Sequence, residues 1–106
     1  MHVIIWQFEV HPTKKREFVS AYGPEGDWAR LFKQADGYCG TDLMQSADRP
    51  DDFITIDRWA GAEDFANFRK RFSDRYSALD ARFSNLTVIE KKIGTFELYD
   101  PPKAHQ

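Results

Sequence analysis

The sequence has few of the residues that build disulfides, metal centres or membrane segments. Cys39 is the single cysteine among 106 residues, which excludes an internal disulfide and a cysteine-rich zinc site. The three histidines, His2, His11 and His105, lie near chain ends or turns. No stretch approaches the roughly 20 apolar residues of a membrane helix. Charged residues follow a very short apolar start, so we expect no signal peptide.

The chain also has no large excess of positive or negative charge. The chain has 15 Lys+Arg against 17 Asp+Glu, a net charge of −2, which argues against a nucleic-acid binder driven by bulk charge. We expect a reduced, cytoplasmic protein that binds neither nucleic acid nor membrane. The 42% of hydrophobic residues suffices for one packed domain. That domain is expected over residues 1–99, with 100–106 as a flexible tail.

Branched and aromatic residues predict four strands, because they suit a pleated, packed surface. These strands span residues 3–10, 38–46, 53–59 and 86–98. A first helical region runs from about Lys14 to Gln34, with Phe18, Val19 and Tyr22 on one side and an interruption at 23–26. A second helix follows Gly61 and carries large apolar side chains at steps of three and four residues, the spacing of one buried helix face. These are Phe65, Phe68, Phe72, Tyr76, Leu79 and Phe83.

This order of elements predicts an α+β, ferredoxin-like βαββαβ fold with an antiparallel four-stranded sheet. The first and third strands are the most apolar and should be central, and we expect those two to run parallel. Both helices should cover one face, which leaves Val3, Ile5, Ile54 and Ile56 on the other. Burying four such side chains is worth roughly 6–12 kcal/mol. We therefore predict an obligate homodimer.

Two segments resemble a known family. The run FVSAYGPEGDWARLF, residues 18–32, resembles the first helix of the antibiotic biosynthesis monooxygenase-like family, and Asp57-Arg58-Trp59 followed by Phe65 and Phe68 resembles its third strand and second helix. The resemblance covers residues 3–98 and implies a dimeric α+β barrel. Characterised relatives include oxygenases that use no metal or flavin and oxidise phenols or quinols with O₂. Others degrade haem.

A cofactor-free oxygenase needs an apolar pocket, a proton acceptor and a donor for the substrate anion. Trp6, on the helix-facing side of the first strand, is a candidate wall and donor, or alternatively a core tryptophan. Asp57 is the candidate proton acceptor, or alternatively forms a structural ion pair with Arg69 or Arg75. Tyr76 is the third candidate catalytic residue, and its hydroxyl could instead simply reach the surface.

Further aromatic residues are candidates for substrate binding, and each could equally be part of the core. They are Tyr22, Tyr38, Trp59, Phe68 and Phe72. Asn67 lies nearly opposite the aromatic stripe and should face solvent.

The leading hypothesis is a cofactor-independent monooxygenase that oxidises a small aromatic or quinol-type substrate with O₂, without a metal. The alternative is a non-catalytic small-molecule-binding or structural dimer, whose phenylalanines fill the space that a pocket needs. A third hypothesis, a haem-degrading monooxygenase, is disfavoured. Haem-degrading relatives place a histidine late in the second helix, where this chain has Ala78.

Overall fold

The computed structural model describes residues 1–99, so the predicted tail at 100–106 lies outside the described residues. The described chain forms strands, α-helices and one short 3₁₀ turn. In chain order they are β1 (His2–Val10), α1 (Lys15–Tyr22), α2 (Asp27–Phe32), β2 (Tyr38–Gln45), β3 (Asp52–Trp59), α3 (Ala62–Arg71), α4 (Ser73–Phe83), η1 (Ser84–Leu86) and β4 (Thr87–Glu97).

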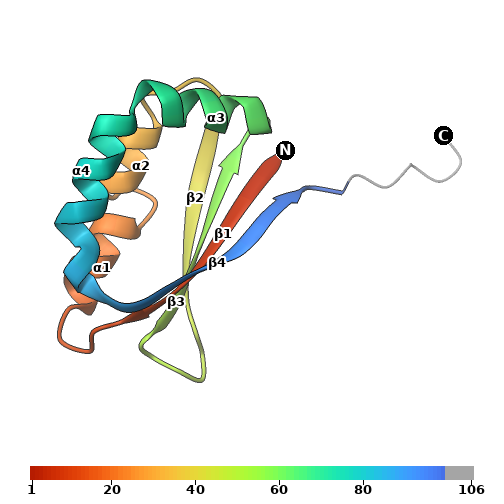
Figure 1. The fold of residues 1–106 in the computed structure, drawn as a ribbon. Coiled ribbons are helices and arrows are strands. Elements are labelled where there is room, and N and C mark those ends of the chain that lie inside the picture. The colour runs from red at the N-terminus through yellow and green to blue at the C-terminus, as the bar shows by residue number, and fades with distance from the viewer. Residues whose placement is uncertain (100–106) are drawn as a thin grey trace, which may run out of the picture.

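All four α-helices lie on one side of a single sheet (Figure 1). The strand order is β2-β3-β1-β4, and every neighbouring pair is antiparallel. The α+β, ferredoxin-like fold with central first and third strands is therefore confirmed. The expected parallel pairing of those two strands is wrong. The crossover through α1 and α2 makes β2 parallel to β1, and the following hairpin then reverses β3.

Both helical regions are broken in ways that locate the core. Gly23 and Pro24 separate α1 from α2, and Phe18 is fully buried while Val19 is 45% exposed, contrary to the prediction for Val19. The predicted long helix divides at Phe72, whose φ of −112° and ψ of 24° are not helical. The Tyr76 N–H still bonds to the Phe72 carbonyl, so the break is a kink. The apolar side chains of α3 and α4 pack against the core on both sides of this kink.

Aromatic rings fill the core at the end of the sheet near α3. Trp59 and Phe68 are 0% and 1% exposed, with ring centroids 5.3 Å apart. Phe32 of α2 lies 5.2 Å from Phe68 and 5.6 Å from Trp59 in edge-on contacts. Such tilted contacts add stabilisation beyond simple burial. This cluster fixes α2, α3 and β3 relative to one another.

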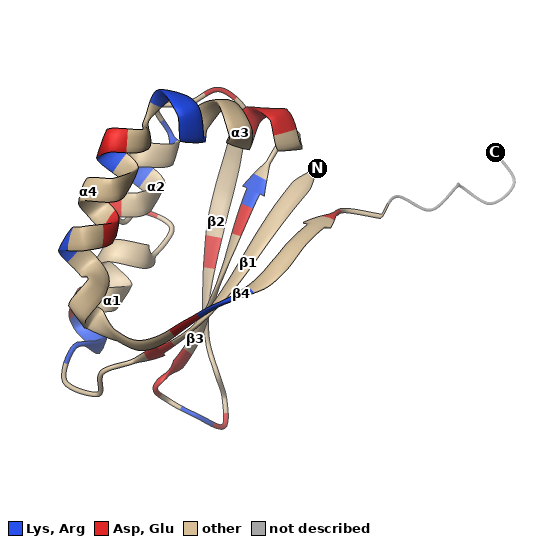
Figure 2. Cartoon of the chain, viewed as in Figure 1, with Lys and Arg blue, Asp and Glu red and all other residues tan. Residues whose placement is uncertain are grey.

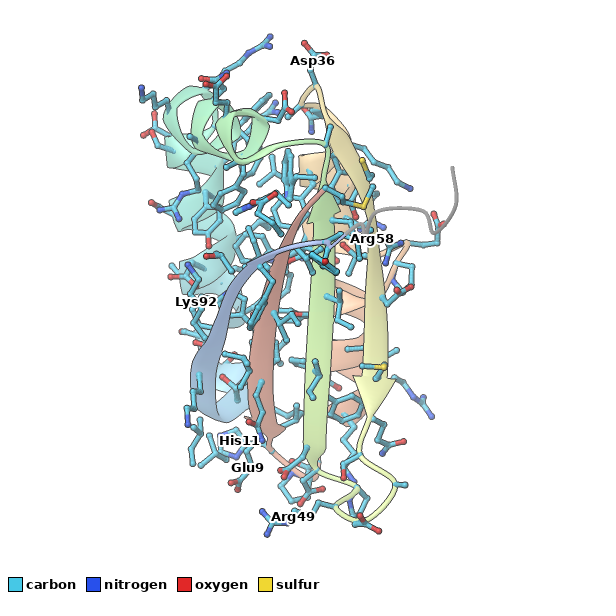
Figure 3. The ribbon with its side chains drawn as sticks, turned by 90° about the vertical axis from the view of Figure 1, so that its right-hand side faces the viewer. Glu9, His11, Asp36, Arg49, Arg58 and Lys92 are labelled. Carbon is cyan, nitrogen blue, oxygen red and sulfur yellow. The ribbon has the colours of Figure 1, made fainter. Side chains whose placement is uncertain are left out.

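The opposite face of the sheet carries apolar side chains that no helix covers (Figure 3). Ile5 of β1 stands directly opposite Ile56 of β3, and Met44 of β2 stands opposite Ile54. Met44 is 47% exposed, as is Phe96 of β4. Most charged residues lie instead on the helices and loops, and the strands are largely uncharged (Figure 2). The expected bare apolar face is therefore present. Within residues 1–99, the helices are too short and too polar to cross a membrane.

Replacing Phe68 with alanine should destabilise the fold by about 3–5 kcal/mol, because it removes a ring from the centre of the packed cluster. Urea unfolding followed by circular dichroism measures this change. Asn67→Ala is the control, since Asn67 is an exposed neighbour on the same helix and its loss should change stability by less than about 0.5 kcal/mol. Equal effects of the two substitutions would contradict this account of the core.

Candidate functional site

A cavity of about 330 Å³ lies between the sheet and the helices. Its walls combine aromatic rings with a few ionisable and hydroxyl groups, the composition of a small-molecule site. The lining residues are Trp6, Phe8, Tyr22, Trp28, Phe32, Thr41, Thr55, Asp57, Arg69, Tyr76, Asp80 and Glu90.

Three strands supply the floor of the cavity through alternation of their side chains. Trp6 of β1 is paired with Thr55 of β3, and Thr41 of β2 is paired with Asp57 of β3. Thr55 and Asp57 are two residues apart, so they point to the same face, toward the helices. The register therefore places a carboxyl, two hydroxyls and an indole in one patch.

Asp57 is held by a chain of two short hydrogen bonds. The Thr41 hydroxyl donates to the Asp57 carboxylate at 2.6 Å, and the Tyr38 hydroxyl lies 2.6 Å from the Thr41 oxygen. A threonine hydroxyl has one proton, which is engaged with Asp57, so Tyr38 must donate to Thr41. Tyr38 thereby orients Thr41, and Thr41 orients the carboxylate.

The carboxyl group of Asp57 has a pKa well above its usual value. Burial raises the pKa of its carboxyl to about 6, while the Thr41 hydrogen bond and the charge of Arg58 oppose that rise. The Arg58 guanidinium pairs with Asp42 at 2.5 Å on the other face of the sheet. Within residues 1–99, Asp57 forms no ion pair, so the alternative of a structural pair with Arg69 or Arg75 is wrong.

The helices supply the roof of the cavity. Trp28 of α2 meets the ring of Tyr76 of α4 edge-on at 4.9 Å, and the Tyr22 ring of α1 lies 6.1 Å from Trp28. The Arg69 guanidinium lies 4.0 Å from the Tyr76 ring centre, a cation–π contact. Burial raises the pKa of both the Tyr22 and the Tyr76 hydroxyl. Both hydroxyls therefore stay protonated at neutral pH and can donate hydrogen bonds.

One buried donor in this roof lacks a partner. The indole Nε1 of Trp28 is fully enclosed and forms no hydrogen bond with any residue of the described chain. Leaving such a donor unpaired costs about 1–3 kcal/mol. Sequence analysis did not single out Trp28 as a site residue, because helical spacing does not separate a ring that fills a core from one that lines a cavity. Asp80 of α4 and Glu90 of β4 were also missed, since charged residues on exposed elements carry no distinguishing pattern.

Four of the eight predicted site residues line this cavity, namely Trp6, Tyr22, Asp57 and Tyr76. The other four do not line it. Tyr38 is one step away, bonded to Thr41 behind the wall. Trp59 and Phe68 form the packed cluster described above, and Phe72 borders two separate hollows that other residues of α3 and α4 also line.

The described residues contain no group of three or more histidine, cysteine or acidic side chains able to hold a metal ion. Within that part of the chain, the cavity lining also includes no histidine or cysteine. His2 pairs instead with Glu97 at 2.5 Å, joining the ends of β1 and β4. The polar groups that line the cavity are therefore hydrogen-bond donors and acceptors among aromatic rings.

Several solved structures share this fold. SnoaB, a cofactor-independent oxygenase from Streptomyces nogalater, has a TM-score of 0.65 at 19% identity, covering 96% of this chain and 97% of that chain. Rv0793 from Mycobacterium tuberculosis has a TM-score of 0.70 at 17% identity, covering 96% and 98%. A conserved protein from Methanosarcina mazei Go1 has a TM-score of 0.67 at 15% identity, covering 90% and 89%. At these identities the likeness establishes the fold alone.

A comparison with curated proteins finds no significant match by sequence. The family model for antibiotic biosynthesis monooxygenases matches residues 1–78. That segment includes β1 to α3 and the first part of α4, and with them Trp6, Tyr22, Asp57 and Tyr76. The match spans most of the chain, and the chain therefore belongs to the antibiotic biosynthesis monooxygenase family.

Proposed function

We propose that this protein is a cofactor-independent monooxygenase that oxidises a small aromatic or quinol-type substrate with O₂. The observation that carries this proposal is a carboxyl group with a pKa near 6, without a cationic partner, in the wall of a largely aromatic cavity. A group with that pKa is ionised in about nine molecules of ten at pH 7 and can still accept a proton, which suits a general base. The proposed catalytic domain is residues 1–99.

Asp57 removes the proton from a substrate hydroxyl in this mechanism. The substrate O–H bond breaks, a new O–H bond forms on the carboxylate, and the ring becomes an electron-rich anion. Trp6, Tyr22 and Tyr76 surround the ring, and their N–H and O–H groups donate hydrogen bonds to the anion. Donors are most effective in such a cavity because its low dielectric strengthens each interaction.

The deprotonated substrate itself supplies the electrons for O₂. In a phenol, the hydroxyl oxygen and one ring carbon each lose one hydrogen atom. That carbon gains one oxygen atom as a carbonyl, the hydroxyl becomes the second carbonyl of a quinone, and the other oxygen atom of O₂ leaves as water. Atoms and electrons balance without an external reductant. The protein's contribution is to create the anion, orient it and exclude bulk water.

Tyr38 and Thr41 act on this chemistry through Asp57. Their hydrogen bonds stabilise the ionised carboxylate against the effect of burial. We assign Tyr38 as a positioning residue, because it contacts Thr41 and lies behind the cavity wall. Trp59, Phe68 and Phe72, which were also candidates for substrate binding, are assigned to packing that supports the wall.

Family membership adds support of a coarser kind. The family is named for monooxygenases, and SnoaB, which shares the fold, is described as a cofactor-independent oxygenase. The main competing function is non-catalytic binding of a small molecule in the same cavity. That alternative expects phenylalanines to fill the space that a pocket needs. A cavity of about 330 Å³ with convergent polar groups favours the enzyme instead. Haem degradation remains the less favoured third function.

The proposal includes a cytoplasmic homodimer joined through the helix-free sheet face. Ile5, Ile56 and Met44 lie together there, and the exposed Phe96 extends the apolar area onto β4. A second copy could cover this face in a self-complementary way. The proposed small-molecule partners are the aromatic substrate and O₂, bound on the other side of the sheet.

Oxygen consumption tests the proposed reaction. Phenols and quinols added to the metal-free, flavin-free protein should give O₂ uptake, and kcat/KM should fall as the pH drops below about 6, because Asp57 must be ionised to accept a proton. Asp57→Asn should lower kcat by about 10²–10⁴-fold. Asp74→Asn, at an exposed site on α4, is the control and should retain activity. Binding without O₂ uptake across the panel would favour the non-catalytic alternative.

The hydrogen-bond chain can be tested without a substrate. Thr41→Val removes the donor at nearly constant volume, so the pKa of Asp57 should rise by roughly one unit. Carbon-13 NMR of the aspartate carboxyl groups measures this titration. Thr55→Val is the matched control, because Thr55 is buried on the same face and forms no hydrogen bond to Asp57 among the described residues. An unchanged Asp57 titration in Thr41→Val would refute the role given to Thr41.

The dimer is tested by placing a charge on the helix-free face. Ile56→Lys should convert the protein to a monomer, because a lysine at the centre of an apolar interface loses water without gaining a partner. Light scattering at micromolar concentration measures the mass. Val19→Lys, on the exposed side of α1, should remain dimeric. A monomeric mass for the unmodified protein would remove the dimer from the proposal.

A further inference from the structure

A second hollow, of about 470 Å³, lies where the end of α2 meets the kink between α3 and α4. Its walls are Gln34, just after α2, and Arg71, Phe72, Asp74 and Arg75 at the kink. None of these residues lines the cavity between the sheet and the helices. The hollow is therefore a separate feature, and its volume is within the range of small-molecule sites.

The segment around the kink is strongly basic. Figure 2 shows basic residues in blue where α3 meets α4. Residues 69–75 contain the single carboxylate of Asp74 and four basic side chains, in a chain whose net charge is −2; these are Arg69, Lys70, Arg71 and Arg75. None of the four forms an ion pair with any described residue, whereas four arginines elsewhere each pair with an aspartate. The positive charge at the kink thus lacks a counter-ion within residues 1–99.

Helix dipoles account for only part of this arrangement. Arg71 lies in the last turn of α3, where a cation is favourable because the free carbonyl groups carry partial negative charge. Arg75 lies in the first turn of α4, where the same effect disfavours a cation. Both side chains border one hollow, so their like charges also repel each other. An anion in the hollow would relieve both unfavourable terms.

Phe72 brings the two guanidinium groups together. Its ring packs on the buried ring of Phe68, with centroids 5.5 Å apart, and is thereby anchored to the core. The guanidinium carbons of Arg71 and Arg75 lie 5.3 and 5.7 Å from the centre of the Phe72 ring, within the range of cation–π contacts. Arg75 also donates a hydrogen bond to the Gln34 side chain. A guanidinium group has five N–H donors, so both groups keep donors for an anion in the hollow.

We propose that this hollow binds the phosphate group of a small phosphomonoester. One arginine fork is enough for the two oxygens of a carboxylate. A phosphomonoester has three terminal oxygens and a charge of about −1.5 to −2 at neutral pH, so it can engage both Arg71 and Arg75. A phosphodiester, the group found in nucleic acids and many lipids, has one negative charge and two free oxygens and suits the pair less well. This binding does not depend on the proposed oxygenase reaction.

Methyl phosphate and dimethyl phosphate, which differ by one methyl group and one charge, test the proposal. Isothermal titration calorimetry at pH 8 and low salt should give methyl phosphate a dissociation constant of about 1 mM or lower. Dimethyl phosphate, and acetate as the carboxylate probe, should each bind at least about tenfold more weakly. Methyl phosphate should also shift the side-chain Nε–Hε signals of Arg71 and Arg75 in a ¹H–¹⁵N spectrum.

Variants that remove one charge locate the site. Arg71→Gln and Arg75→Gln should each weaken methyl phosphate binding by at least about fivefold. Arg16→Gln is the matched control, because Arg16 is exposed on α1 and also forms no ion pair with a described residue. This control removes the same charge and should change the affinity by less than about twofold.

Three outcomes would overturn the inference. They are no saturable binding of methyl phosphate, equal affinity for dimethyl phosphate, and a loss of affinity in Arg16→Gln as large as in Arg71→Gln. All of these measurements follow binding alone. Absence of O₂ uptake would therefore count against the oxygenase and leave the phosphate site intact, and absence of methyl phosphate binding would do the reverse.

Discussion

A carboxylate buried without a cation is the constraint on which the candidate site depends. Moving Asp57 out of water is unfavourable, and the compensation comes chiefly from the Thr41 hydroxyl, with a smaller contribution from the charge of Arg58. A cation in direct contact would hold the pKa low and leave a weak base. An entirely apolar setting would keep the group protonated at neutral pH. The single hydroxyl donor gives an intermediate value near 6.

Strand β3 links this constraint to the rest of the fold. Thr55 and Asp57 face the helices, while Ile54 and Ile56 face the uncovered side. A shift of one residue in the register would exchange these two sets, placing isoleucines in the cavity and the carboxylate on the bare face. Pairing on both edges of β3 prevents the shift. The cavity and the apolar face are therefore two results of the same register.

Periodicity in the sequence predicted the elements and the general place of the site, because alternation assigns Trp6 and Asp57 to the helix-facing side. It predicted an antiparallel sheet but gave the wrong relative direction for the first and third strands, and it did not predict the kink at Phe72, because both depend on how elements pack in three dimensions. Trp28 illustrates the same limit within the site. Its spacing marks a buried face correctly, yet whether that face meets other rings or empty space depends on α4 and β4, which are far away in sequence. The role of Tyr38 depends on a hydrogen bond with Thr41 of its own strand, which periodicity alone does not reveal.

The cavity stays open because of what borders it. Toward α3 the space between sheet and helices is filled by rings at 5.2–5.6 Å, centred on Trp59 and Phe68. Toward α4 and β4, Asp80 and Glu90 stand where further rings would be needed to fill the space. Moving these two carboxyl groups closer together into an apolar layer would be unfavourable, which opposes closing the void. The acidic rim thus helps to keep the cavity open.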